Sequence, residues 1–343
     1  MWKNCLKRGV KYLLYYSGIF SLINKVIKNN GIYILMYHRI SDTNDEHGHQ
    51  LLSVKKEELV KQIRFFKRNY RCISLPEAIS ILEGKGNLDD NYVVFTFDDG
   101  YIDNFTYGEP IFKEFGIYPN IYITAGNVDT GEPIWTETVD EIFLNCPKFS
   151  KCNEVFDIEI PEKMLHRHEI INYSWMLKDI LIKMPQKDIM KRIEEIKKKV
   201  RYTPSAKTEL LDWEKVKSLA NSGWAIGSHT MSHINLAVES EEIVTRELYD
   251  SFKLIENKIG STTQHFAYPF GMPQHISEYA IDIVKKYYSS AVMATNGINK
   301  CGDDLFRLKR VTMCNHQSII DIKFKLLRLK LTDFFSGEKE FKK

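Results

Sequence analysis

Short apolar runs alternate along most of the chain with stretches of helical periodicity. The first run, 31–40, is rich in β-branched and aromatic residues, which predicts a buried strand that contains a Tyr-His pair near its end. Apolar residues in 55–69 recur at the spacing of one helix face, and a second helix is predicted through 74–81, where a proline lies in the first turn. Two helices therefore separate the first predicted strand from the next.

The same alternation continues toward the other end of the chain. The further predicted elements are a strand at 92–97, a helix at 105–115, a strand at 120–124, a helix at 213–222, a strand at 224–227, a helix at 239–259, a strand at 265–268, a helix at 276–287 and short strands near Ser290 and Arg310. Strands that alternate with helices are typical of a mainly parallel α/β sheet or barrel. We therefore predict an α/β fold.

Residues from about 136 to 208 interrupt this alternation. The segment is helical in pattern and rich in Lys, Glu and Met, and its string KRIEEIKKKV at 191–200 is charged enough to be solvated. We interpret it as a helical insertion in one catalytic domain at 31–325, followed by a basic C-terminal tail at 326–343.

The first 30 residues form a separate segment. Basic residues precede an apolar stretch at 12–27, as in a signal peptide, but polar residues interrupt the stretch and no small-x-small cleavage site follows. The stretch is also shorter than the roughly 20 apolar residues that a spanning helix needs. We expect an amphipathic helix at 1–30 that lies on the protein or makes peripheral contact with a membrane, with an uncleaved anchor or signal as the alternative. The predicted location is cytoplasmic or membrane-peripheral.

The composition excludes some classes of function but does not indicate a particular one. Of 343 residues, 43% are hydrophobic and 27% charged, which is ordinary for a globular protein. The net charge of +3 comes from 48 basic and 45 acidic residues spread along the chain, so nucleic acid is not expected as a partner. The six cysteines form no C-x-x-C pair and are interpreted as reduced thiols.

Three short strings carry the candidate chemistry. They are TFDDGY at 96–101, SHTMSH at 228–233 and FAYPFG at 266–271, and each begins in or directly after a predicted strand. Carboxyl ends of parallel strands converge on one face of a barrel, so side chains distant in sequence meet there. We therefore expect these three strings to build one site.

The residue types in the first two strings indicate a metal. His229 and His233 are four residues apart, which would place both imidazoles on one side of a helical turn. Two imidazoles and one carboxylate are a usual set of ligands for catalytic zinc. The adjacent Asp98 and Asp99 could instead cap a helix or bind magnesium, but magnesium prefers oxygen ligands and the histidines argue against it. Consecutive residues face different ways, so one carboxylate could bind metal while its neighbour meets the attacking water.

The strings TFDDGY, H-T-x-x-H and Y-P-F-G, in this order, resemble the first three motifs of the polysaccharide deacetylase family, also called the NodB-homology or carbohydrate esterase family 4 enzymes. The match extends from Ile34 to about Thr312. The resemblance implies a distorted (β/α) barrel of about seven strands and an enzyme that removes N-acetyl groups from an amino-sugar-containing glycan or glycoconjugate.

The resemblance also implies roles for individual residues. Asp99, His229 and His233 would hold one divalent ion, zinc or alternatively cobalt or nickel, and Asp98 would be the general base. Phe270 would act chiefly through its backbone N–H, which would stabilise the developing oxyanion. Tyr268 and Pro269 are predicted to shape the pocket wall. Trp135 is expected either to line the site by stacking on a sugar ring or to be an ordinary core tryptophan.

The chain departs from the usual family pattern in two places. Ala267 occupies the position of the expected arginine, so Arg310, or alternatively Arg307, is predicted to orient Asp98 in its place. No C-terminal L-L-H-D string supplies the usual acid. The N-terminal MYHRI string is similar to that of circularly permuted family members, which makes His38 the predicted general acid and His316 the alternative.

Two other functions remain compatible with these residues. One is hydrolysis of another non-peptide C–N bond, in a cyclic amide or purine catabolite. The other is carbohydrate binding without turnover, which the missing family arginine makes conceivable.

Overall fold

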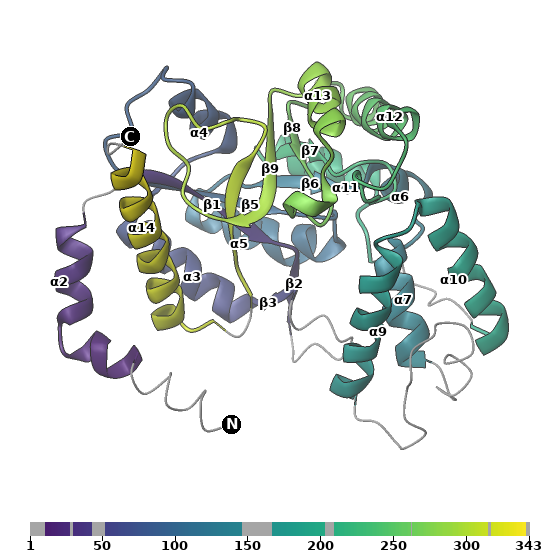
Figure 1. The fold of residues 1–343 in the computed structure, drawn as a ribbon, viewed down its shortest axis with the longest axis horizontal. Helices are drawn as coiled ribbons and strands as arrows, with labels where there is room; N and C mark the ends of the chain where they lie inside the picture. Colours follow the sequence, from purple (N-terminus) through teal and green to yellow (C-terminus); the bar gives the residue numbers. More distant parts are fainter. Residues whose placement is uncertain are drawn as a thin grey trace.

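Seven parallel strands close into a barrel at the centre of the molecule, which confirms the predicted fold (Figure 1). The computed structural model describes residues 11–27, 30–42, 52–145, 167–202, 209–261, 263–314 and 317–340. The barrel strands are, in chain order, β1 (Gly31–Tyr37), β5 (Asn91–Phe97), β6 (Asn120–Ile123), β7 (Ala225–Ser228), β8 (His265–Ala267), β9 (Ser290–Asn296) and β10 (Leu308–Thr312).

The barrel closes because β1 pairs on both of its edges. One edge pairs with β10, and the other pairs with β5 in unbroken register from Gly31 opposite Asn91 to Tyr37 opposite Phe97. β1 is buried along its whole length, as expected for a strand with neighbours on both sides and helices outside.

Two short strands, β3 (Ser53–Lys55) and β4 (Arg71–Cys72), were not predicted, and a third, β2 (Arg39–Ser41), was expected only as the end of the first strand. β4 pairs with the beginning of β5, at Tyr92 and Val93. β2 and β3 form a separate parallel pair. The predicted first strand at 31–40 therefore consists of two strands, with His38 between them.

Helices lie around the barrel strands (Figure 1). They are α3 (Lys56–Asn69), α4 (Leu75–Leu82), α5 (Glu109–Phe115), α6 (Ala125–Thr130), α11 (Trp213–Asn221), α12 (Glu241–Ile259) and α13 (Glu278–Tyr287), with a π-helical turn at Asn104–Gly108 and a 3-10 turn at Pro273–His275. Side-chain caps start several of them. Ser74, Asp212, Ser240 and Ser277 each accept a backbone N–H from the first helical turn, which satisfies a donor that the helix itself cannot.

Three helices in the region of the predicted insertion pack together on one side of the barrel (Figure 1). They are α7 (Trp135–Asn145), α9 (Arg167–Leu181) and α10 (Gln186–Val200). Their apolar faces form a hydrophobic cluster of their own, which includes Phe143, Leu177 and Ile193. The segment thus has its own core beside the barrel core.

The helices near the two ends of the described chain lie side by side (Figure 1). α2 (Ile19–Val26) adjoins α14 (Ile319–Glu340), which continues through residue 326 without a break. The expected boundary between the catalytic domain and the basic tail therefore falls inside this helix. Although the segment is rich in lysine, Leu326 and Leu327 are buried in it. Among the described helices, none is both long and apolar enough to cross a bilayer.

Candidate active site

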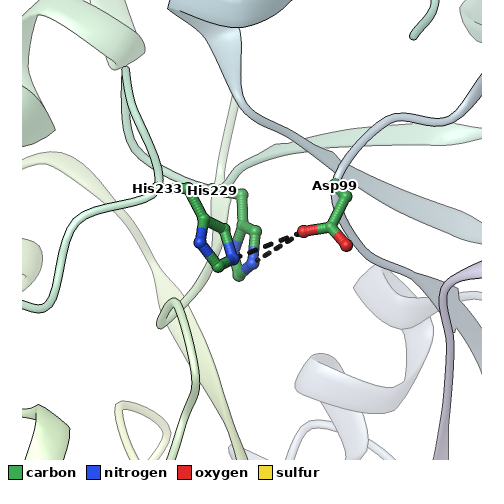
Figure 2. A group of neighbouring side chains, drawn as sticks. All are labelled: Asp99, His229 and His233. Carbon is green, nitrogen blue, oxygen red and sulfur yellow. Dashed lines mark ion pairs between the residues drawn. The ribbon is translucent and has the colours of Figure 1, made fainter. Parts of the chain in front are cut away.

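Asp99, His229 and His233 meet at the carboxyl ends of the barrel strands (Figure 2). Asp99 follows β5, and the two histidines lie in the loop after β7. The Oδ1 atom of Asp99 is 3.5 Å from Nε2 of His229 and 3.4 Å from Nε2 of His233. The three ligand atoms lie within 4.8 Å of one another and all three residues are buried, so the geometry fits a single shared ion.

The polar atoms of this cluster fit a divalent cation. Nδ1 of His229 lies 2.7 Å from the carbonyl oxygen of Ala267, and because a carbonyl only accepts, Nδ1 carries the proton and Nε2 presents a lone pair toward Asp99. Burial lowers the pKa of His229 and lowers that of His233 well below its usual value, so both rings are neutral. Oδ1 of Asp99 is buried without a hydrogen-bond partner among the described residues. Lone pairs that face one another in this way call for a cation between them.

The pKa of the Asp99 carboxyl group also indicates that a positive charge belongs at this position. Burial and then the neighbouring Asp98 carboxylate raise the pKa of Asp99 well above its usual value. An ion bound between the three side chains would favour the ionised carboxylate and remove this penalty.

The backbone is locally strained around the cluster. Among the described residues, five other than glycine have positive φ, and four of them are at the site: Asp99 (74°), Thr230 (66°), His233 (55°) and Phe270 (60°). The fifth is Arg201, which ends α10. Left-handed φ costs free energy for residues with a Cβ and tends to gather at functional sites.

The two histidines do not lie on a helical turn, and that prediction was wrong. The left-handed φ values of Thr230 and His233 are incompatible with a right-handed helix. A hydrogen bond of 2.9 Å from the His233 N–H to Oγ1 of Thr230 holds the loop, and the Glu247 carboxylate accepts the N–H groups of Met231 and Ser232. Glu247 on α12 is a supporting residue that the sequence reasoning missed, since no spacing links it to the loop.

Asp98 and Arg310 form a buried ion pair beside the cluster. The guanidinium donates from Nη1 to Oδ1 at 2.6 Å and from Nη2 to Oδ2 at 2.7 Å, and its Nε donates to the Met293 carbonyl. Burial alone would raise the pKa of Asp98, but the facing guanidinium outweighs it and lowers this pKa to about 2. Arg310 thus makes the predicted contact with Asp98, whereas Arg307 is a surface residue that pairs with Glu278.

His38 also lies close to Asp98. Its Nε2 atom is 3.9 Å from Oδ2 of Asp98, and burial lowers the pKa of the imidazole to about 4. The structure therefore places the predicted acid next to the predicted base. The alternative acid, His316, lies outside the described residues.

These groups open into one cavity of about 330 Å³. Tyr268 and Phe270 are among its lining residues, as predicted, and the Tyr268 hydroxyl donates to the Phe306 carbonyl. The Phe270 N–H has no acceptor within the part of the chain that the structure describes, so it is free to donate to a ligand. Pro269 is buried but does not line the cavity, so the prediction that it shapes the wall was wrong.

Trp135 does not line the cavity either, and the stacking prediction was wrong. Its side chain is buried at the start of α7, and its indole Nε1 donates a hydrogen bond of 3.1 Å to the carbonyl oxygen of His233. The indole therefore positions a loop that carries a candidate ligand. The tryptophan that lines the cavity is instead Trp175 on α9, together with Lys178. It was missed because it lies in the segment that was interpreted as a helical insertion, away from the three motif strings.

Replacing Trp135 with phenylalanine should weaken metal binding by about 10-fold or more, because groups that hold a metal ligand in place typically contribute this much. The measurement is a competition titration with a chelator of known affinity. Trp213→Phe is the matched control, since its indole donates to Asp129 at 2.8 Å and neither residue lines the cavity. Equal metal affinity in both variants would show that the Trp135 indole does not support His233.

A parallel barrel that brings a carboxylate, two imidazoles and a second, arginine-bound aspartate to its strand ends has the groups that a hydrolytic deacetylase requires. The chain belongs to the polysaccharide deacetylase family, because the family model of that description matches residues 85–292.

Relatives extend this comparison beyond the matched segment. The chain is 22% identical over 279 residues to YxkH of Bacillus subtilis (strain 168), covering 81% of this chain and 70% of that protein. The fold is similar to that of the Streptococcus pyogenes deacetylase PplD in complex with acetate, with a TM-score of 0.59 at 18% identity over 88% of this chain and 99% of PplD. It is also similar to IcaB from Ammonifex degensii, with a TM-score of 0.57 at 16% identity over 88% of this chain and 98% of IcaB.

Proposed function

We propose that this protein removes N-acetyl groups from an amino-sugar-containing glycan or glycoconjugate with the help of one divalent metal ion. The observation that carries the proposal is the meeting of Asp99, His229 and His233 beside the Asp98–Arg310 pair in one cavity. Membership of the polysaccharide deacetylase family supports the reaction class. An acetylated amino sugar is the substrate class that this membership implies.

Zinc is the ion we propose for the site, with cobalt or nickel as alternatives. Two neutral imidazoles and one carboxylate suit zinc, and three protein ligands leave coordination positions for water and substrate. When bound, the ion polarises the acetamide carbonyl and makes water more acidic.

In the proposed reaction Asp98 is the base. Arg310 fixes both of its oxygens and keeps it ionised, so the carboxylate is oriented to accept a proton from the attacking water. The water oxygen adds to the acetamide carbon, and the Phe270 N–H would stabilise the negative charge that develops on the carbonyl oxygen.

His38 is proposed to protonate the departing nitrogen. Because burial keeps its imidazole neutral at pH 7, the proton that it donates must arrive during the reaction, and Asp98 is 3.9 Å away. The water proton would thus pass through Asp98 and His38 to the amine as the C–N bond breaks. The products are acetate and a free amino sugar, so the protons balance.

The direct test is acetate release by the purified full chain from N-acetylglucosamine oligomers, measured together with its metal content. We expect about one divalent ion per chain and acetate release that a chelator abolishes and added zinc or cobalt restores. Cyclic amides and purine catabolites belong in the same panel. Hydrolysis of these alone would assign the protein to another C–N hydrolase, and sugar binding without acetate would identify a carbohydrate-binding relative.

A further inference from the structure

The N-terminal helical segment at 11–26 has one face packed on the protein. Phe20 is buried, and its ring centroid lies 5.0 Å from that of Phe324 on α14. On the same side, Lys323 donates to the Tyr15 hydroxyl at 2.6 Å, and Lys11 pairs with Asp321 at 2.7 Å. These contacts fix the orientation of the segment relative to α14.

Apolar side chains of this segment are open to solvent in both of its helical stretches, 11–16 and α2, which a turn at Ser17–Gly18 separates. Leu13, Tyr16, Leu22 and Val26 are exposed by 71%, 75%, 64% and 73%. The spacings 13 to 16 and 22 to 26 are those of neighbours on one helix face. Among the described residues, no other large apolar side chain is as exposed as these four. Figure 1 shows that α2 lies at the edge of the molecule, away from α9 and α10.

The charged side chains in the first 30 residues are all basic. The first 30 residues contain six basic side chains (Lys3, Lys7, Arg8, Lys11, Lys25 and Lys28) and no Asp or Glu. The whole chain is almost balanced, with 48 basic and 45 acidic residues. Exposed apolar side chains on a segment of positive charge are the combination that binds the surface of an anionic membrane, because apolar burial and electrostatic attraction add.

We propose that the segment at 11–26 docks on the surface of a membrane that contains anionic lipid, with Leu13, Tyr16, Leu22 and Val26 in the interfacial layer. Contacts with α14 hold the segment in place, so its docking would hold the barrel at the membrane surface. This inference does not depend on the hydrolase assignment.

The test is co-sedimentation of the full chain with phosphatidylcholine vesicles that do or do not contain phosphatidylglycerol. We expect binding to the anionic vesicles only, weakened by salt because the basic residues contribute through screened charges. The double variant L13E/L22E should lower the partition coefficient at least about tenfold, since two exposed side chains lose their apolar burial. Met190→Glu is the matched control, because Met190 is exposed on α10 and should leave binding unchanged.

Three outcomes would overturn the proposal. They are no binding to either kind of vesicle, equal binding by L13E/L22E and wild type, and a wild-type dimer in gel filtration that L13E/L22E converts to a monomer. The last would assign the face to a second copy of this chain. Acetate release from soluble oligomers should be the same in L13E/L22E and wild type, which separates this test from the proposed function.

Discussion

Asp99→Ala should lose the bound metal ion and lower acetate release by at least about 10³-fold, because a metal ion contributes several kcal/mol of transition-state stabilisation. Asp99 is the only acidic ligand in the cluster, and two neutral imidazoles alone bind a divalent ion weakly. The measurements are metal content after dialysis and the rate of acetate release at saturating substrate.

A thermal unfolding experiment separates this effect from misfolding. Added zinc should raise the Tm of the wild type, since an ion that binds only the folded state stabilises it, and should leave that of Asp99→Ala unchanged. Without metal, the variant should be at least as stable as the wild type, because it lacks a buried oxygen that has no partner. Asp282→Ala, at an exposed position on α13, is the control. Retention of one tightly bound ion by Asp99→Ala would contradict the assignment of this ligand.

Asp98→Asn should retain the metal but lower kcat by about 10² or more, which is the usual contribution of a general base. The amide keeps an oxygen that Arg310 can donate to, so the variant should fold. Asp98→Ala is a poorer choice, because it removes both acceptor oxygens as well as the counter-ion and leaves the buried guanidinium with no partner at this position, at a cost of about 3–5 kcal/mol.

The decisive comparison is kcat per bound metal ion in Asp98→Asn and wild type. A rate near that of the wild type, with full metal content, would remove Asp98 from the role of base. Loss of metal along with rate would instead mean that Asp98 acts by supporting the ligands.

Much of the barrel could be predicted because its strands are short apolar runs that helices separate. The carboxyl ends of parallel strands converge, so the strings at 96–101 and 228–233 were expected to meet, and Asp99 does lie beside the two imidazoles. Arg310 was among the predicted partners of Asp98 because it lies in the last predicted strand segment, although the sequence could not separate it from Arg307.

Features that depend on side-chain direction or on left-handed backbone could not be predicted. A spacing of four residues fits a helix, and no residue type in the string SHTMSH predicts the positive φ of Thr230 and His233. The direction of Trp135 depends on how α7 docks on the barrel, which the local sequence does not encode. α14 was missed because the many lysines of this segment suggested a solvated tail, although Ile322, Leu326 and Leu327 are buried.

The pairing of β1 with β5 has a consequence for how the proposed proton path is maintained. Tyr37 lies opposite Phe97 in this ladder, and the Asp98 N–H donates to the Tyr37 carbonyl at 3.0 Å. The main chain before His38 is thereby tied to the main chain of Asp98, so the distance between acid and base is set by the backbone more than by neighbouring side chains. Substitutions in the pocket wall should accordingly alter which sugar is accepted while leaving the separation of these two groups intact.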